Sequence, residues 1–353
     1  MRQGTSSLNA KQVWRQWLRW LAPIVVLVVV AFIYRDRLPF LAEAKTALLA
    51  ASWLPLFGAL ATALLAIACM AGVMQILLNV EGRITGPGRT NAITLASNAW
   101  STTVPGGPAI SAWLTYRVQR TWGASVGLCG WFFIISGALS TVWMVLIGVS
   151  AVVLLGANLS VLSLSATFFI AAGTIAAVFW ATRHPTVIKR WVRYLPEKVR
   201  GRVNTVIDQV ASIRMSTGAF AAAAVLSLLN QLLDVATMYF SVWSVLGSAP
   251  GLSAGHNEIT VMGVSLAYIM TKLAGAAQVT PGGLGTVEPV AAAMLVAGGM
   301  TLVSATATTA IYRAVSFAVI TALGWVVYGA VYAGRGYLVG RTDTAAKSTN
   351  ELL

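Results

Sequence analysis

The sequence predicts an all-α polytopic membrane protein with about six transmembrane helices and two re-entrant helical hairpins. Composition is the first reason, because 58% of the 353 residues are hydrophobic and only 10% are charged. Soluble domains carry about a quarter charged residues, so these charges are too few to cover a soluble globule. The second reason is a series of long apolar runs, and the third is a Pro-Gly-Gly sequence inside two of them.

Six apolar runs are long enough to be full spans, since a membrane-spanning helix needs roughly 20 mainly apolar residues. They are residues 17–34, 53–80, 124–156, 159–182, 217–247 and 302–333. The first run follows a basic stretch and precedes Arg35-Asp36-Arg37. A cleavable signal needs small residues at that place, so we expect an uncleaved first span.

Two further apolar runs, residues 91–117 and 259–298, are each interrupted in the middle. The interruptions are Pro105-Gly106-Gly107 and Pro281-Gly282-Gly283. Proline removes a backbone donor and glycine frees the backbone dihedrals, so neither helix continues through its break. The arms 91–103 and 287–298 are too short to cross a bilayer alone. We therefore predict two re-entrant hairpins, with a full span over 259–277 as the alternative for the second.

The distribution of basic residues predicts the orientation. Most of the 24 Lys and Arg residues fall on one side when each full span changes side and each hairpin does not. Basic residues favour the cytoplasmic side, so we expect a multi-pass protein of the cell (cytoplasmic or inner) membrane with both termini cytoplasmic. Residues 1–156 and 157–353 then have opposite orientations. The single membrane domain, residues 1–353, is thus predicted to be an inverted-topology repeat.

The segment 183–216 is strongly basic and carries apolar residues at helical spacing on both sides of Pro196. Two amphipathic helices lying on anionic inner-leaflet lipids, contacted over 183–214, explain both features. The alternative is a solvated connector on the cytoplasmic side. Because the basic residues cluster between apolar spans, we attribute the net charge of +14 to the membrane surface and expect no nucleic-acid partner.

Four ionisable residues lie in predicted membrane segments: Asp234, Lys272, Glu288 and Arg313. Such side chains cost roughly 2.5 to 3.5 kcal/mol or more at the bilayer centre, so those that persist are candidates for function. Steps of three and four place Asp234 and Arg313 on polar helix faces. The first face holds Ser227, Asn230, Thr237 and Ser241, and the second holds Thr306, Thr309 and Ser316. The alternative is interhelical hydrogen bonding with two charge pairs that neutralise each other.

The second break is the stronger candidate for a binding site. The helix that starts after it has backbone N–H groups without partners, and such an end attracts anions, notably phosphate. We expect Arg313 to add a bidentate phosphate contact. Glu288, in the first turn of that helix, is expected to pair with Arg313 or Lys272, to meet a cationic headgroup, or to take a proton.

The glycines of both breaks are also assigned to the substrate site. These are Gly106, Gly107, Gly282 and Gly283. Their alternative role is close helix packing or a simple hinge. Only the second break has charged neighbours, so the first is expected mainly to be its structural counterpart.

No catalytic motif is recognisable. The sequence contains no Walker loop, nucleophile elbow or paired histidines. Cys69 and Cys129 lie in apolar runs, and His184 and His256 stand far apart, so neither a disulfide framework nor a metal site is predicted. We expect neither enzymatic activity nor a cofactor.

The chain resembles a known family at the two breaks. The second reads Pro281-Gly282-Gly283-Leu284-Gly285-Thr286-Val287-Glu288, with Tyr312-Arg313 in the next span, and the first reads Val104-Pro105-Gly106-Gly107-Pro108. These strings are similar to the flippase-like transmembrane region of lysylphosphatidylglycerol synthases, and the resemblance covers nearly the whole chain. It implies movement of lipids with polar headgroups across the cytoplasmic membrane, and it points to Glu288 and Arg313 as functional residues.

Two features depart from that family. Many members carry an acidic residue just after the first glycine break, whereas Pro108-Ala109-Ile110-Ser111 follows here. We therefore do not assign the headgroup preference of those members to this chain. The chain also lacks the soluble aminoacyltransferase domain of the full synthases, so we do not expect it to make lysylphosphatidylglycerol.

We therefore predict a lipid flippase for a polar or anionic headgroup, on a phospholipid or a polyprenyl-phosphate-linked sugar. The expected partners are membrane lipids with phosphate headgroups. The alternative is a membrane subunit or accessory of a polyprenyl-phosphate-dependent glycosyltransferase in envelope glycan synthesis, which implies an envelope-biosynthesis enzyme as partner. A third interpretation is a scaffold whose basic segment recruits a cytoplasmic synthase.

Overall fold

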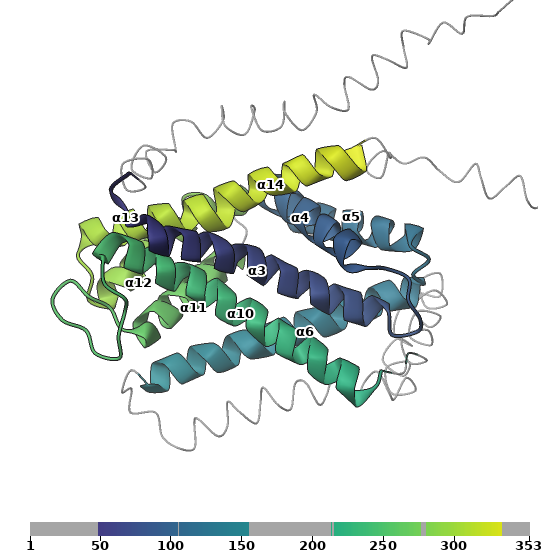
Figure 1. The fold of residues 1–353 in the computed structure, drawn as a ribbon, viewed down its shortest axis with the longest axis horizontal. Helices are drawn as coiled ribbons and strands as arrows, with labels where there is room; N and C mark the ends of the chain where they lie inside the picture. Colours follow the sequence, from purple (N-terminus) through teal and green to yellow (C-terminus); the bar gives the residue numbers. More distant parts are fainter. Residues whose placement is uncertain (1–48, 105, 155–212, 214, 277–279, 334–353) are drawn as a thin grey trace, which may run out of the picture.

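The computed structural model describes residues 49–104, 106–154, 213, 215–276 and 280–333 (Figure 1). Every regular element in these ranges is a helix, as the composition predicts. Four helices are long and apolar enough to cross a membrane, and each falls on a predicted span. They are α3 (Trp53–Leu78), α6 (Val126–Leu154), α10 (Thr217–Leu246) and the continuous helix Leu302–Tyr332.

Several predicted features lie outside the described residues. They are the spans 17–34 and 159–182, Pro105, nearly all of the basic segment 183–216, and both termini. The count of six spans and the amphipathic helices therefore stay predictions.

Helices α3 and α10 run side by side in opposite directions through the centre of the bundle (Figure 1). Two glycines allow the close approach. A Cβ on Gly58 would lie 2.8 Å from the Phe240 ring, and a Cβ on Gly72 would lie 3.0 Å from Leu226. Hydrocarbon gives little hydrophobic drive for helices to associate, so such small residues at the contact are what hold a membrane pair together.

The last long helix contains two π-helical segments. It consists of α13 (Leu302–Arg313), the π-helical turns η3 (Ala314–Val319), α14 (Ile320–Val327) and the π-helical turns η4 (Tyr328–Tyr332). π-helical turns are rare and occur frequently at functional sites. The first of them follows Arg313 directly.

The first Pro-Gly-Gly run forms two helices, α4 (Pro87–Thr103) and α5 (Gly107–Thr121). The predicted break is confirmed, although both arms extend beyond 91–117. Helix α4 starts earlier because Pro87 occupies its first turn, where a missing N–H costs nothing. Gly106 has φ +69°, a left-handed conformation that favours glycine. A Cβ on Gly107 would overlap the carbonyl groups of Trp100 and Ser101, so a glycine is required where α5 starts against the end of α4.

The second run forms α11 (Val261–Ala276), the short 3-10 turn η2 (Pro281–Gly283) and α12 (Val287–Ala297). This break is also confirmed, with φ +61° at Gly282 and +66° at Gly283. Helix α11 has 16 residues, fewer than the roughly 20 that a full span needs. The choice between a re-entrant arm and a full span at 259–277 stays a prediction, because α11 ends at the last described residue before the break.

The two broken helices lie toward opposite ends of the bundle and touch at their breaks. In Figure 1, α4 and α5 lie where α3 finishes, and α11 and α12 lie where α10 finishes. Helix α4 contacts η2, and a Cβ on Gly282 would lie 2.8 Å from the Thr102 carbonyl oxygen. The hydroxyl groups of Thr102 and Thr321 are 3.0 Å apart, which ties α4 to α14. The breaks therefore meet inside the helix bundle.

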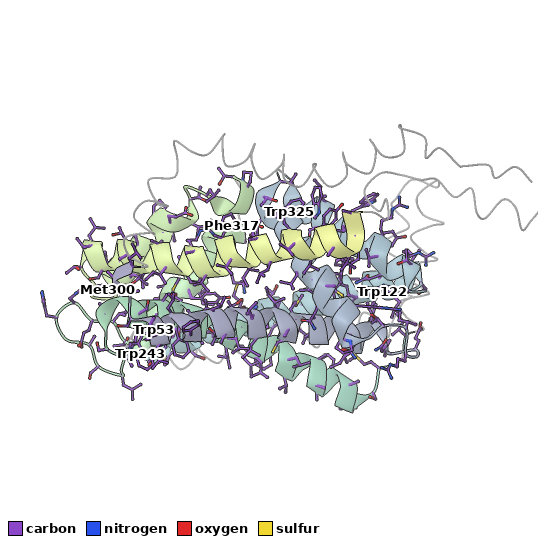
Figure 2. All side chains as sticks on the ribbon, turned by 45° about the horizontal axis from the view of Figure 1, so that its top comes forward. Trp53, Trp122, Trp243, Met300, Phe317 and Trp325 are labelled. Atoms are coloured by element: carbon purple, nitrogen blue, oxygen red, sulfur yellow. The ribbon has the colours of Figure 1, made fainter. Side chains whose placement is uncertain are left out.

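Tryptophan side chains occur toward both ends of the bundle. Trp53 and Trp243 lie toward one end, and Trp122 lies toward the other (Figure 2). Trp53 is exposed, whereas Trp122 and Trp243 are half-buried. Tryptophan concentrates at the boundary between hydrocarbon and water, so these rings indicate where the bundle crosses the two membrane interfaces.

Gly324→Ala is expected to destabilise the protein. The added methyl group would overlap the Leu95 carbonyl and approach Ala99 at the contact of α14 with α4. Overpacking of this kind costs about 1 to 3 kcal/mol. Thermal unfolding of the purified protein in detergent measures the effect as a lower melting temperature.

Gly130→Ala is the matched control for this substitution. Gly130 also lies within a helix, α6, but no atom lies within 4 Å of its added Cβ. Alanine favours a helix over glycine by about 1 kcal/mol, so this variant is expected to melt slightly higher than the wild type. Equal melting temperatures for the two variants would contradict tight packing between α4 and α14.

Candidate functional site

Two ion pairs lie in the interior of the bundle, and they contain the four ionisable residues singled out in the sequence. Lys272 Nζ lies 3.1 Å from Asp234 Oδ2, and Arg313 Nε lies 2.8 Å from Glu288 Oε1. Of the two partners expected for Glu288, the structure thus selects Arg313. The four charges form two separate pairs.

Both pairs lie deep in the membrane-spanning region. At about 1.5 Å per residue, Asp234 lies about 18 Å before the end of α10, and Arg313 about 17 Å after the start of α13. Those two helix ends lie at the same end of the bundle (Figure 1). A hydrocarbon core is about 30 Å thick, so both pairs are close to its middle.

Arg313 joins three elements. Its Nε donates to Glu288 in α12, and its Nη2 donates to the Gly282 carbonyl oxygen in η2 at 2.8 Å. The guanidinium carbon lies 4.4 Å from the centre of the Phe317 ring, one turn further along the same helix. The side chains of Arg313 and Glu288 are only 7% and 15% exposed. This pair therefore fixes the second break against the last long helix.

Glu288 occupies the position where an anion was expected. Its Oε1 accepts from Arg313, and its Oε2 accepts the backbone N–H of Gly285 at 2.7 Å. The carboxylate thus contacts both the guanidinium group and a backbone donor at the start of α12. A phosphate group would reach these donors only by replacing the carboxylate.

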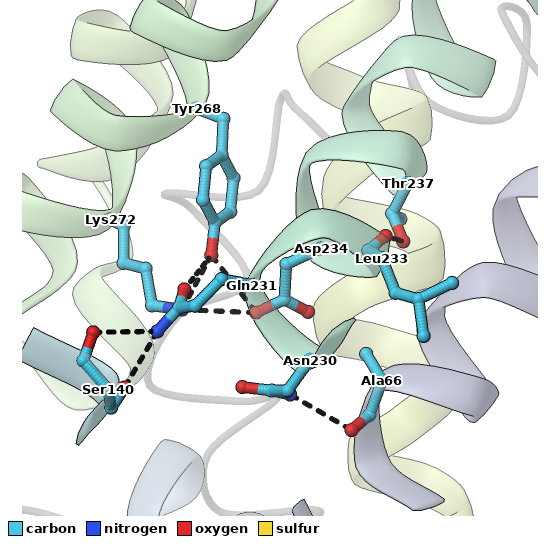
Figure 3. A network of polar contacts seen from close by, with 9 residues as sticks. All are labelled: Ala66, Ser140, Asn230, Gln231, Leu233, Asp234, Thr237, Tyr268 and Lys272. Carbon is cyan, nitrogen blue, oxygen red and sulfur yellow. Dashed lines mark hydrogen bonds and ion pairs between the residues drawn. The ribbon is translucent and has the colours of Figure 1, made fainter. Parts of the chain in front are cut away.

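The pair formed by Lys272 and Asp234 belongs to a larger polar network between α6, α10 and α11 (Figure 3). Lys272 donates to three oxygens: Gln231 Oε1 at 2.7 Å, Tyr268 Oη at 2.5 Å and Asp234 Oδ2 at 3.1 Å. The Tyr268 hydroxyl also lies 3.0 Å from Asp234 Oδ2. Gln231 Nε2 donates to Ser140 Oγ at 2.6 Å, which anchors the network on α6. All three N–H groups of the Lys272 ammonium have partners.

Sequence reasoning missed Gln231 and Tyr268, which are both buried. Gln231 precedes Asp234 by three residues, and Tyr268 precedes Lys272 by four. Those steps put each on the same helix face as its charged neighbour, so helical spacing was the available signal.

The two pairs differ in exposure. The side chains of Lys272 and Asp234 are each 32% exposed, several times the fraction for Arg313. The first pair is therefore accessible from the surroundings of the bundle, and the second is nearly enclosed.

Two of the other polar residues in the predicted stripes hold helices together. Asn230 Nδ2 donates to the Ala66 carbonyl at 2.9 Å, and the Thr237 and Thr62 hydroxyls are 3.0 Å apart, so both join α10 to α3. Ser227 and Ser241 are buried. Thr306, Thr309 and Ser316 donate to carbonyl groups of their own helix. The alternative of interhelical hydrogen bonding therefore describes Asn230 and Thr237, but not the three residues that bond within their own helix.

The break glycines have backbone roles in this structure. A Cβ on Gly282 would overlap the Phe317 ring, and one on Gly283 would overlap Val287. Gly107 is equally closely packed, whereas no atom lies within 4 Å of a Cβ on Gly106, which is exposed. Close packing thus accounts for three of the four, and only Gly106 faces open space.

The family model described as lysylphosphatidylglycerol synthase TM region matches residues 12–324 of the chain. This match covers most of the sequence and includes both breaks and both ion pairs. It confirms the predicted family resemblance. Comparison with curated proteins gives no match.

Glu288→Ala is expected to lower the stability strongly, because it leaves the buried Arg313 charge without its partner. Breaking a buried pair in this way costs about 3 to 5 kcal/mol. The double variant Arg313→Met with Glu288→Met removes both charges and is expected to regain part of the lost stability, because the Gly282 carbonyl and the Gly285 N–H still lose their partners. Melting temperatures in detergent measure both effects. A double variant less stable than Glu288→Ala alone would contradict the pairing.

Proposed function

The chain belongs to the lysylphosphatidylglycerol synthase transmembrane-region family, and on that basis we propose that it is a lipid flippase. In this proposal a polar headgroup crosses the membrane beside the two helix breaks while the acyl or prenyl chains stay in the bilayer. The observation that carries it is the meeting of both breaks near the middle of the bundle, next to two ion pairs.

The physical requirement for such a protein is a polar path through hydrocarbon. A headgroup loses its hydrogen bonds to water when it enters an apolar medium, and an isolated charge loses far more. Non-helical backbone and ionisable side chains supply replacement partners, but they persist at membrane depth only where protein or water surrounds them. The breaks and the pairs place such groups together at mid-membrane, which supports a path for the headgroup.

An inverted repeat is part of this proposal, and the helix contacts support it. Exchanging the two halves pairs α3 with α10, α4 with α11, α5 with α12, and α6 with the helix Leu302–Tyr332. Under this exchange, the contact between α4 and α14 becomes the contact between α11 and α6, and both are present. The contact between α3 and α4 likewise becomes the contact between α10 and α11, and both of these are present too. The central contact of α3 with α10 corresponds to itself. Inverted repeats of this kind build alternating-access transporters, in which two halves rock about a central site.

We further propose that a headgroup phosphate binds by replacing the Glu288 carboxylate. Departure of that carboxylate frees the Arg313 Nε and the Gly285 N–H together. A guanidinium group binds phosphate oxygens through parallel hydrogen bonds, and the start of a helix adds favourable backbone donors. The exchange keeps the Arg313 charge paired throughout. The displaced Glu288 carboxylate must then take a proton or pair with a cationic group of the headgroup.

Arg313→Met with Glu288→Met is expected to lower lipid translocation at least tenfold, in protein whose melting temperature shows that it is folded. The measurement uses proteoliposomes with acyl-chain fluorescent phospholipids and dithionite quenching of the outer leaflet, with and without an imposed pH gradient. Gly130→Ala is the control and should translocate at the wild-type rate. Wild-type rates in the double variant would overturn the site assignment. Turnover of a lipid-linked sugar without translocation would instead favour the glycosyltransferase subunit.

The proposed topology places the first hairpin on the cytoplasmic side. The four described arginines near that end are Arg83, Arg89, Arg117 and Arg120, whereas the segments 247–260 and 298–301 at the opposite end contain no Lys or Arg. Basic residues favour the cytoplasmic side, which supports this orientation.

Single cysteines test this topology in a background with Cys69→Ser and Cys129→Ser. Gly88→Cys and Thr121→Cys bracket the first hairpin, and Ser253→Cys and Leu302→Cys bracket the second. A membrane-impermeant thiol reagent is expected to label the first two from the cytoplasmic side and the last two from the outside. Labelling of positions 88 and 121 from opposite sides would show that α4 and α5 together cross the membrane. That result would contradict the proposed re-entrant hairpin.

A further inference from the structure

We infer that the transported headgroup is zwitterionic, carrying one phosphate and one ammonium group, and that it is recognised at Lys272 and Asp234. This inference rests on the proposed function and names the substrate class. It departs from the sequence-based expectation of an anionic headgroup held first by Arg313.

Charge balance is the first argument. Among the described residues, the charged side chains of the bundle interior are two carboxylates and two cations, arranged as two neutral pairs. A net charge in a low-dielectric interior is costly, because ions lose their hydration there. A zwitterionic headgroup leaves the interior neutral when it enters. An anionic headgroup leaves it with one uncompensated negative charge.

Accessibility is the second argument, and it selects the pair that meets the headgroup first. Lys272 and Asp234 are each 32% exposed, whereas Arg313 and Glu288 are 7% and 15% exposed. Charged groups near the middle of a membrane do not face lipid, so the exposed faces of the first pair adjoin polar surroundings. A headgroup therefore reaches Lys272 and Asp234 before it reaches Arg313.

The hydrogen bonds of the network show how such a headgroup would fit. Lys272 and Tyr268 both lie against the same oxygen, Asp234 Oδ2, at 3.1 and 3.0 Å. When Lys272 and Asp234 separate, the ammonium and the hydroxyl become donors for phosphate oxygens. The Asp234 carboxylate becomes an acceptor for the ammonium of the headgroup. One intramolecular ion pair is thereby exchanged for two pairs with the lipid, each charge-assisted.

Gln231 keeps the site assembled during this exchange. Its Nε2 is held by Ser140 on α6, and its Oε1 accepts from Lys272 at 2.7 Å. Gln231 is fully buried and uncharged, so it orients the Lys272 ammonium without changing the charge balance. The lysine thus keeps one fixed partner while it exchanges the others.

The test compares three lipids that share the same fluorescent acyl chain in proteoliposomes of the full-length protein. They are phosphatidylethanolamine, its N-acetyl derivative, which keeps the phosphate but loses the ammonium charge, and phosphatidylglycerol. The wild type is expected to move phosphatidylethanolamine at least tenfold faster than either anionic lipid.

Asp234→Asn is the decisive variant, because it removes one negative charge and keeps the side-chain shape. The interior then carries one excess positive charge, so the preference is expected to shift at least tenfold toward the two anionic lipids. Tyr268→Phe is the neutral comparison, and it should slow all three lipids without changing their ratio. The melting temperature of each variant confirms that it is folded.

The outcomes separate this inference from the proposed function. Equal wild-type rates for the three lipids, or an unchanged ratio in Asp234→Asn, would overturn the zwitterionic preference and leave the flippase in place. No translocation of any lipid by the wild type would overturn the flippase itself, and the headgroup inference with it.

Discussion

The rest of the structure depends on how two interrupted backbones are satisfied inside a membrane. Hydrocarbon offers no hydrogen bonds, so a helix break at that depth must find its partners within the protein. Here the second break uses charged side chains for this purpose. Arg313 donates to the carbonyl of Gly282, and Glu288 accepts the N–H of Gly285. The same two residues neutralise each other, so one pair of side chains provides both backbone satisfaction and charge compensation.

The double role of Arg313 and Glu288 explains why the two breaks are not equivalent. The first is closed by close packing, since Gly107 lies directly against the end of α4 and the described residues bring no charge to it. It supplies a rigid surface, the Thr102 carbonyl, against which Gly282 rests. The second break carries the charges and can exchange partners. An uncharged break and a charged break thus meet where Gly282 lies against Thr102, although the same Pro-Gly-Gly pattern creates both.

The sequence was sufficient for the elements whose signal is local. Apolar length predicted α3, α6 and α10, and Pro-Gly-Gly predicted both breaks, because those effects act within one segment. The pairing of the charged side chains, by contrast, does not follow from any one segment. Asp234 and Lys272 stand on different helices, so only the packing of α10 against α11 decides that they meet, with Gln231 between them. The exposure that separates the two ion pairs also depends on neighbouring helices, which no single segment specifies.

The contact between Arg313 and the second break limits how the protein can move. The turn η2 cannot move away from Arg313 without breaking the hydrogen bond from Arg313 to the Gly282 carbonyl. Phe317, in the π-helical turns after Arg313, packs against the same glycine. A buried guanidinium left without partners costs several kcal/mol, so movement of η2 in an empty protein is strongly disfavoured. On the proposed function, a headgroup that supplies replacement oxygens removes that cost. The movement is then tied to the presence of lipid, because the ion pair that closes the break in the empty protein is the one that the lipid must replace.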